Sequence, residues 1–295
     1  MYIPTAKGYF SGCGGLEIGV MQAGVNVIQS LDLDPDATAC MKKNRHYFSH
    51  DVLTIDIKNK TVLEQPVSDI ILGTYPCTKY SAIADIHSTR TGDDLFLHFF
   101  RHIALARPEM YVVENVPGMK KFKVVMEAMT KLPDYYVHVF CPVDALNWLP
   151  QSRKRLILIG TRKPFNIEEP KPVSNRPKLK EILEDNPNVE TPEYIFNRLN
   201  GKYRDKPIII DPENPDAVAP TCLAHYSKDL GTRLVKDKKS KYGIRPFSIR
   251  EYARLQGFPD DYHFDNKRYS YKLIGNAVPV HMGKWIGMQA MKYFN

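Results

Sequence analysis

The sequence predicts an α/β protein with a doubly wound, mostly parallel sheet and a smaller, irregular second domain. A glycine-rich turn, residues 12–15, is followed by a helical pattern and then by an apolar strand, as in a βαβ unit. Further short apolar strands end in polar residues, the position where ligands bind in an open α/β sheet. From Pro164 to about Pro215, proline is frequent and the periodicity is short, which places a domain boundary near Lys163.

The expected elements of the larger domain follow in chain order. Gly24 stops the first helix, which is expected over 16–23. Strands are expected over 25–31, 69–72, 110–113, 134–143 and 156–160, and helices over 95–106 and from 280 onward. Between the strands expected over 134–143 and 156–160 lie Arg153 and Arg155, which alternate and, on a strand, would project to one face. Ser248 with Glu251 forms a capping-box pattern that predicts another helix, ended by Gly257.

Composition restricts the class of protein without naming a function. The chain has 295 residues and a formal net charge of +8, which suits a polyanionic partner and also many proteins that bind none. Its five cysteines are odd in number and widely spaced, so neither a disulfide framework nor a metal site is indicated. No signal pattern or membrane-spanning apolar run appears, and we expect a reduced, cytoplasmic protein without a membrane partner.

The most informative single residue is Cys77. It follows Pro76 directly after the strand expected over 69–72, so a thiol stands at the mouth of a strand. Pro76 fixes its own φ and favours an extended Tyr75, which would hold the thiol in one direction. Taken alone, such a cysteine is more often a small buried apolar residue than a nucleophile.

Of the two acids Asp32 and Asp51, only Asp32 has the spacing of a cofactor ligand. Asp32 lies about twenty residues after the glycines, where a ribose-binding acid stands in a dinucleotide-type βαβ unit. The turn lacks the GxGxxG spacing of nicotinamide enzymes, and such a turn with an acid also occurs by chance. Asp51 equally suits a helix N-cap or a turn.

Five segments taken together resemble the DNA cytosine-5 methyltransferase family, of the small prokaryotic or phage type. They are Phe10-Ser11-Gly12-Cys13-Gly14-Gly15, Pro76-Cys77, Glu114-Asn115-Val116, Gln151-Ser152-Arg153-Lys154-Arg155 and Gly275-Asn276-Ala277-Val278-Pro279. The resemblance runs from about Phe10 to about Met282 and lapses over about 164–215. It implies a methyltransferase sheet that binds S-adenosylmethionine, with a catalytic domain of 1–163 plus 272–295 and a target-recognition domain of 164–271.

The resemblance also implies the site residues. The catalytic set is Cys77, Glu114, Asn115, Arg153 and Arg155: the thiolate adds to cytosine C6, Glu114 protonates N3, Arg155 contacts O2, and Arg153 orients Arg155 or Glu114. Asp32 would bind the ribose, Asp51 the adenine amine, and Val52 the adenine ring. The full cofactor-binding set is Phe10, Gly12, Gly14, Gly15, Leu16, Asp32, Leu33, Asp51, Val52, Pro76, Leu95, Asn276 and Val278.

Double-stranded DNA is the implied substrate, and the target cytosine must be flipped out of the helix. Ser81, His87 and Arg90 are candidate DNA contacts in the polar stretch after Cys77. Within the basic cluster of 233–245, Arg233, Lys238 and Lys239 are candidate phosphate contacts. A solvated surface is the alternative interpretation of such basic segments. We expect a monomer associated with the nucleoid, with a cognate restriction endonuclease as a possible partner.

Two other functions remain open, and the chain departs from the family pattern in places. A DNA-binding regulator of the same fold would lack activity, and a tRNA cytosine-5 methyltransferase would carry a Cys-Phe-Thr tripeptide, which is absent here.

The family usually has Asp-Leu-Phe before the glycines, but this chain has Gly8-Tyr9-Phe10, so the acid is missing. Thr78 and Tyr75 replace the usual Gln and Phe around Pro-Cys.

Overall fold

The computed structural model describes residues 1–63, 67–76, 95–202, 204–205 and 207–295. They form two compact units. Unit 1 contains 1–144, 154–170 and 280–295, and unit 2 contains 145–153 and 171–279. Compactness does not assign a function, so the division into catalytic and target-recognition domains stays a prediction.

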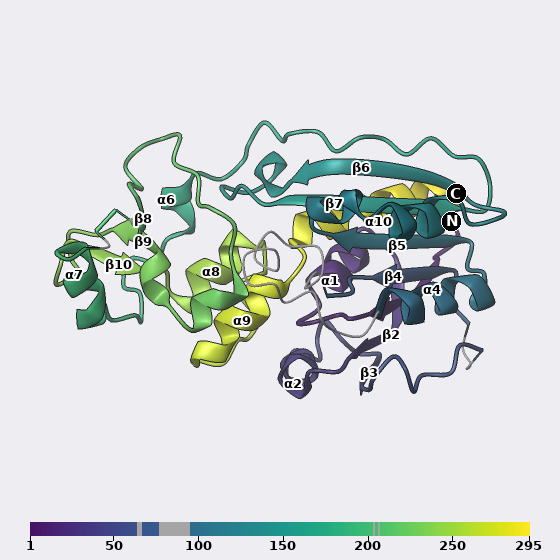
Figure 1. The fold of residues 1–295 in the computed structure, drawn as a ribbon, viewed down its shortest axis with the longest axis horizontal. Helices are drawn as coiled ribbons and strands as arrows, with labels where there is room; N and C mark the ends of the chain where they lie inside the picture. The colour runs from purple at the N-terminus through teal and green to yellow at the C-terminus, as the bar shows by residue number, and fades with distance from the viewer. Residues whose placement is uncertain (64–66, 77–94, 203, 206) are drawn as a thin grey trace. The chain divides into compact units, whose positions relative to one another are not determined.

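A seven-stranded sheet in the order β3-β2-β1-β4-β5-β7-β6 organises the described part of unit 1 (Figure 1). Its strands are β1 Thr5–Tyr9, β2 Asn26–Asp32, β3 Asp51–Thr54, β4 Ile70–Gly73, β5 Met110–Asn115, β6 Tyr136–Asp144 and β7 Lys154–Thr161. Neighbouring strands from β3 to β5 pair in parallel, whereas β7 is antiparallel to both β5 and β6. The predicted doubly wound, mostly parallel α/β fold is confirmed.

Strand β1 lies in the middle of the sheet although its sequence is poor in apolar residues. It pairs with β2 on one side and with β4 on the other, so Gly8 lies opposite both Ser30 and Leu72. Tyr9 packs into the apolar core with Phe99 of the helix α4, Leu95–Ala106. Side chains alternate along a strand, so the position of Gly8 faces the opposite side of the sheet. The weak apolar pattern of β1 therefore conceals a central strand.

Helices cover the sheet of unit 1, and two of them meet through glycines. The helices are α1 Gly15–Gln22, α2 Pro35–Lys43, α4, α5 Lys123–Thr130 and α10 Val280–Phe294, with the 3₁₀ helix η1 Pro117–Lys121. A Cβ atom on Gly19 of α1 would lie 2.2 Å from the carbonyl oxygen of Val280, and one on Gly283 of α10 would lie 2.7 Å from that of Leu16. Glycine at both positions therefore permits α1 and α10 to pack backbone against backbone.

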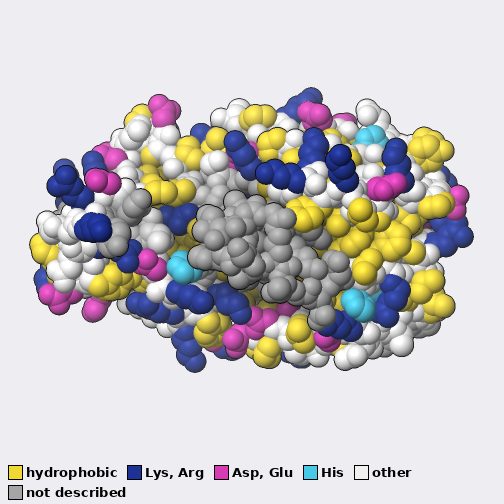
Figure 2. Space-filling model, in the orientation of Figure 1, with side chains coloured by type: hydrophobic (Ala, Val, Ile, Leu, Met, Phe, Trp, Pro, Cys, Tyr) yellow, Lys and Arg dark blue, Asp and Glu magenta, His cyan; other side chains and the backbone are white. Residues whose placement is uncertain are grey.

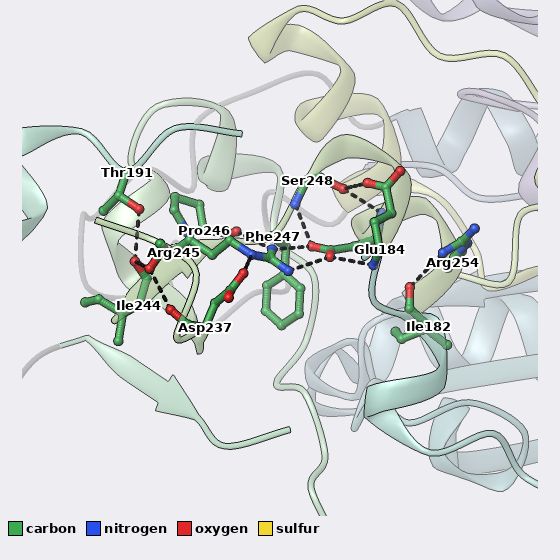
Figure 3. A network of polar contacts seen from close by, with 12 residues as sticks. Ile182, Glu184, Thr191, Asp237, Ile244, Arg245, Pro246, Phe247, Ser248 and Arg254 are labelled. Atoms are coloured by element: carbon green, nitrogen blue, oxygen red, sulfur yellow. Dashed lines mark hydrogen bonds and ion pairs between the residues drawn. The ribbon is translucent and has the colours of Figure 1, made fainter. Parts of the chain in front are cut away.

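Unit 2 is built from short elements around a buried ion-pair network. They are η2 Ala145–Asn147, α6 Leu179–Ile182, α7 Glu193–Leu199, β8 Ile208–Ile210, η3 Ala224–Ser227, η4 Leu230–Thr232, β9 Arg233–Lys236, β10 Ile244–Pro246, α8 Ile249–Leu255 and α9 Arg268–Asn276. The predicted capping box is confirmed, because Ser248 Oγ accepts from Glu251 N while Glu251 Oε2 accepts from Ser248 N. Arg245 pairs with Asp237 at 2.6 Å and with Glu251 at 2.7 Å, and Figure 3 shows Arg245 beside Asp237 within this network.

No described helix combines the length and the apolar character that crossing a bilayer would require.

Candidate active site

An ion pair joins the ends of two neighbouring strands in unit 1. Arg155 Nε lies 2.7 Å from Glu114 Oε1, and both side chains are about nine-tenths buried. The antiparallel pairing of β5 with β7 places Glu114 opposite Ile157, which brings the two charges together. A guanidinium with a carboxylate in a largely dry place can orient and polarise a planar ligand.

Asn115 fixes the backbone that leads to Cys77. Its Nδ2 donates to the carbonyl oxygen of Tyr75 at 3.1 Å, and its Oδ1 accepts from Val116 N. The Tyr75 ring is buried, and its hydroxyl donates to the Met119 sulfur at 3.1 Å. Strand β4, the ion pair and Asn115 therefore meet at one edge of the sheet, directly before Pro76. Cys77 itself lies outside the described residues, as do Ser81, His87 and Arg90.

The glycine turn closes over the end of β1. Phe10, Gly12 and Gly14 have positive φ angles of 60°, 57° and 77°. A Cβ atom on Gly14 would lie 2.3 Å from Phe48, whereas one on Gly12 would meet no atom of the described residues within 4 Å. Gly14 is therefore required by packing, and Gly12 leaves open space in which a ligand can approach the backbone.

Asp32 is tied to this turn. Its Oδ2 accepts from Gly12 N and its Oδ1 from Asp34 N, each at 2.8 Å. Burial raises the pKa of the Asp32 carboxyl, and these backbone donors oppose that rise. Each oxygen of this carboxylate can accept a further hydrogen bond. Asp32 can therefore also accept from ribose hydroxyls, as the sequence predicted.

The other predicted cofactor residues differ in exposure. Leu33 and Asp51 are exposed, whereas Leu16 and Val52 are buried. Pro76 is exposed and Leu95, the first residue of α4, is half-buried. Because the Leu16 side chain lies in the core, that residue can meet a ligand only through its backbone.

The prediction that Arg153 and Arg155 project from one strand is wrong. Strand β7 begins at Lys154, so Arg153 precedes it and belongs to unit 2. Its guanidinium donates to the carbonyl oxygens of Cys222, Gly275 and Ala277 at 2.7–3.0 Å. The buried arginine therefore satisfies backbone carbonyl oxygens for which irregular segments provide no backbone donor. Its predicted part in orienting Arg155 or Glu114 stays a prediction.

The segment that Arg153 holds contains the two remaining cofactor candidates. Asn276 is exposed and Val278 is buried, within unit 2. Gly275 has no room for a side chain, because its Cβ atom would lie 2.4 Å from Ala224 N.

The candidate phosphate contacts of unit 2 are not equivalent. Lys238 and Lys239 are exposed, and Arg233 is half-buried. Arg245 of the same basic cluster is buried and paired, so it is part of the core of the unit rather than a surface cation. On the face drawn in Figure 2, Lys and Arg side chains are spread over the surface instead of forming one patch.

Sequence reasoning missed Glu17. This side chain is 1% exposed, and its Oε2 has no hydrogen-bond partner within the described residues. Burial raises the pKa of Glu17 to about 7, opposed by the nearby Ser11 hydroxyl and by the backbone N–H of Glu17 itself. The signal available in the sequence was an acid in the otherwise apolar helix that follows the glycines, eight helical residues reading GLEIGVMQ.

The family is decided by a match over almost the whole chain. The model described as C-5 cytosine-specific DNA methylase matches residues 8–292. The chain belongs to this family. Its enzymatic class is therefore that of a DNA cytosine-5 methyltransferase, as the sequence motifs predicted.

Two bacterial relatives of this methylase align with nearly the whole chain. Type II methyltransferase M.Sau96I of Staphylococcus aureus is 26% identical over 97% of the chain and 75% of the relative. Type II methyltransferase M.FnuDI of Fusobacterium nucleatum is 28% identical over 92% of the chain and 89% of the relative. The methylase thus aligns with most of each of these two bacterial proteins.

Solved structures confirm the fold of the methylase. The Entamoeba histolytica methyltransferase EhMeth superposes with a TM-score of 0.83 at 18% identity and covers 100% of both chains. The Dnmt2 methyltransferase of S. pombe gives 0.75 at 17% identity over 99% of both chains. A putative DNA modification methyltransferase encoded within an E. coli prophage gives 0.74 at 20% identity, also over 99% of both.

Proposed function

We propose that this methylase transfers a methyl group from S-adenosylmethionine to C5 of a flipped-out cytosine in duplex DNA, through a covalent bond between Cys77 and C6. The observation that carries the proposal is the Glu114–Arg155 pair at 2.7 Å, beside the backbone that Asn115 fixes before Pro76. A charged, largely buried pair at the edge where a thiol emerges suits activation of a planar base.

Each residue has a separate task on the cytosine ring. Cys77 as thiolate adds to C6, and the C5=C6 electrons then make C5 nucleophilic. Glu114 faces N3 and assists its protonation as charge builds on the ring, and Arg155 donates to O2. The Tyr75 carbonyl, which accepts from Asn115, also accepts from the exocyclic amine that thymine lacks.

Methyl transfer and release complete the reaction. When bound, the donor would supply an electrophilic methyl on a sulfonium. The C5 electron pair would form the new C–CH3 bond while the S–CH3 electrons stay on sulfur, leaving S-adenosylhomocysteine, and a base or a water would then remove the C5 proton. The electrons of that C–H bond reform the C5=C6 double bond and expel Cys77 as thiolate.

The glycine turn fits this cofactor. Gly12 leaves open space over the turn, Asp32 offers acceptor lone pairs for ribose hydroxyls, and Glu17 keeps a buried oxygen without a partner. We propose that the whole set of cofactor-binding residues predicted from the sequence contacts this ligand. Leu16 would do so through its backbone, because its side chain is buried.

Unit 2 supports a role in holding the DNA. We place base-specific recognition within 164–271 and phosphate contacts at Lys238, Lys239 and Arg233, while 1–163 with 272–295 carries catalysis. Ser81, His87 and Arg90 would meet the DNA near the flipped base. We further propose a cytoplasmic, nucleoid-associated monomer, which a cognate endonuclease would accompany in a restriction-modification system.

The test is transfer of labelled methyl to duplex DNA, followed by bisulfite sequencing. Cys77→Ser should abolish transfer, whereas Glu114→Gln should lower kcat by about 10²- to 10⁴-fold because a positioned acid is lost. Cys141→Ser changes a half-buried cysteine on β6 and is the matched control, with unchanged transfer.

Three results would contradict the proposal. Full activity of Cys77→Ser would exclude the covalent route. Transfer to tRNA but not to duplex DNA would favour the RNA enzyme, and cofactor binding without any transfer would favour a DNA-binding regulator.

A further inference from the structure

We propose that Glu17 holds the α-ammonium group of the methyl donor, as a positioning residue of the cofactor site. The inference rests on the proposed function in that S-adenosylmethionine is the ligand of the glycine turn. It assigns the amino-acid end of that ligand to a residue of α1 that the family motifs did not select.

Glu17 reaches from α1 into a space that Gly8 leaves empty. A Cβ atom on Gly8 would lie 2.1 Å from Glu17 Oε1 and 2.8 Å from Ser11 Oγ. The carboxylate thus lies against β1, one residue before the end of that strand, inside the loop formed by the glycine turn. A side chain at position 8 and the carboxylate of Glu17 exclude each other.

The position of Gly8 is where the family pattern has an acid. This chain therefore lacks a carboxylate on β1 but brings one to the same place from the first turn of α1. The carboxylate beside this position of β1 is thus supplied by α1 and not by the strand itself.

The missing partner of Glu17 indicates a cationic ligand. Its Oε2 is fully enclosed and accepts no bond within the described residues, whereas each oxygen of neighbouring Asp32 accepts from a backbone N–H. A buried carboxylate oxygen that accepts no hydrogen bond is costly, and such an atom is generally explained by a group that binds there. Among the cationic groups of the ligand, only the ammonium carries N–H donors, since the sulfonium has none.

The titration of Glu17 gives the inference a signature. With a pKa of about 7, part of the population is protonated near neutrality, and a bound ammonium favours the ionised form. Binding should therefore release a proton. Two other titratable groups influence Glu17 or respond to it: Asp32, whose charge raises the pKa of Glu17, and the buried Cys13 thiol, whose own pKa lies far above neutrality.

The test is calorimetric binding of three ligands to the full chain without DNA. S-adenosylmethionine and S-adenosylhomocysteine both carry the ammonium, whereas 5′-methylthioadenosine lacks the amino-acid end. Glu17→Gln keeps the size of the side chain and removes its charge, and it should weaken the first two ligands at least tenfold at pH 7.5 while leaving the third within twofold. Asp36→Asn removes an exposed acid at the start of α2 and serves as the control, with all three affinities unchanged.

A pH series provides a readout that a purely structural role would not move. From the pKa of about 7, the affinity of the wild type for S-adenosylhomocysteine should rise roughly 25-fold from pH 5.5 to 7.5, and that rise should be lost in Glu17→Gln. Any remaining slope would belong to Asp32.

Failure of this inference is distinguishable from failure of the proposed function. If the wild type binds and Glu17→Gln binds all three ligands equally well, Glu17 has no such role. Equal weakening of all three ligands would mean that Glu17 only supports the turn, and it would overturn the assignment too. If the wild type binds none of them, the cofactor proposal falls and takes this inference with it.

Discussion

Two buried glutamates in this methylase occupy the same helical position and have opposite surroundings. Glu17 is the third residue of α1 and Glu251 is the third residue of α8, and neither is more than 1% exposed. Glu251 accepts from Arg245, from Ser248 N and from Glu184 N. Among the residues that the structure describes, Glu17 has no donor to its Oε2.

The difference separates a carboxylate that builds the fold from one that awaits a ligand. The donors around Glu251 are all supplied by the chain, so its charge is compensated as soon as unit 2 has folded (Figure 3). The charge of Glu17 is not compensated in this way. Both glutamates are therefore buried, and they differ in how many hydrogen-bond donors the chain supplies to their carboxylate oxygens.

The largest effect should follow from removing the charge of Glu251. Glu251→Gln leaves Arg245 buried with one partner fewer, and loss of one member of a buried pair costs about 3–5 kcal/mol. Urea unfolding of the full chain measures this loss. Glu213→Gln, which breaks an exposed pair with Lys180, is the control and should leave the midpoint unchanged. An unchanged midpoint for Glu251→Gln would show that the network adds nothing to stability.

Glu17→Gln should act in the opposite direction in the ligand-free protein. The pKa of Glu17 is raised from 4.5 to about 7, so the folded state retains a proton that the unfolded state releases between these values. The stability of the wild type should therefore fall by about 3 kcal/mol as the pH rises from 4.5 to 7. Glu17→Gln should lose this part of the fall and be the more stable form at pH 8. Parallel stability curves for the two proteins would contradict the prediction.

A smaller effect should come from exchanging the two positions. Gly8→Asp alone should destabilise the chain by about 1–3 kcal/mol, because its Cβ would collide with Glu17. Glu17→Ala alone should fold and bind S-adenosylhomocysteine weakly. The double variant should regain stability and part of the affinity, so the two changes should be non-additive by about 1 kcal/mol or more. Additive effects in the denaturation and binding cycles would mean that the two positions do not share one space.

Most elements of unit 1 followed from sequence pattern. The helix expected over 95–106 has those bounds. The strand expected over 110–113 begins at Met110 as predicted and continues two residues further, to Asn115. Strands that are buried in a parallel sheet need continuous apolar runs, and such runs can be recognised directly in the sequence. Strand β1 was less obvious, since Lys7 interrupts its pattern in the middle of the sheet.

The site was less accessible to sequence reasoning than the fold. The motifs named Glu114 and Arg155 and implied both as catalytic residues, and the structure shows them paired. The carbonyl acceptors of Arg153 come from segments far away in the chain, and no local pattern encodes them. Glu17 was missed for a related reason: its significance depends on the absence of a side chain at Gly8, which only the fold brings next to it.

The glycine contact between α1 and α10 has a consequence for the order of assembly. Helix α1 carries the turn at the beginning of the chain, and it is braced by Val280–Phe294 near the other end. Closing so long a loop is slow, so this contact should form late in folding. A nascent chain that has not yet released α10 from the ribosome can pair its strands but cannot brace the turn. Competence to hold the methyl donor should therefore arise only once α10 has docked against α1.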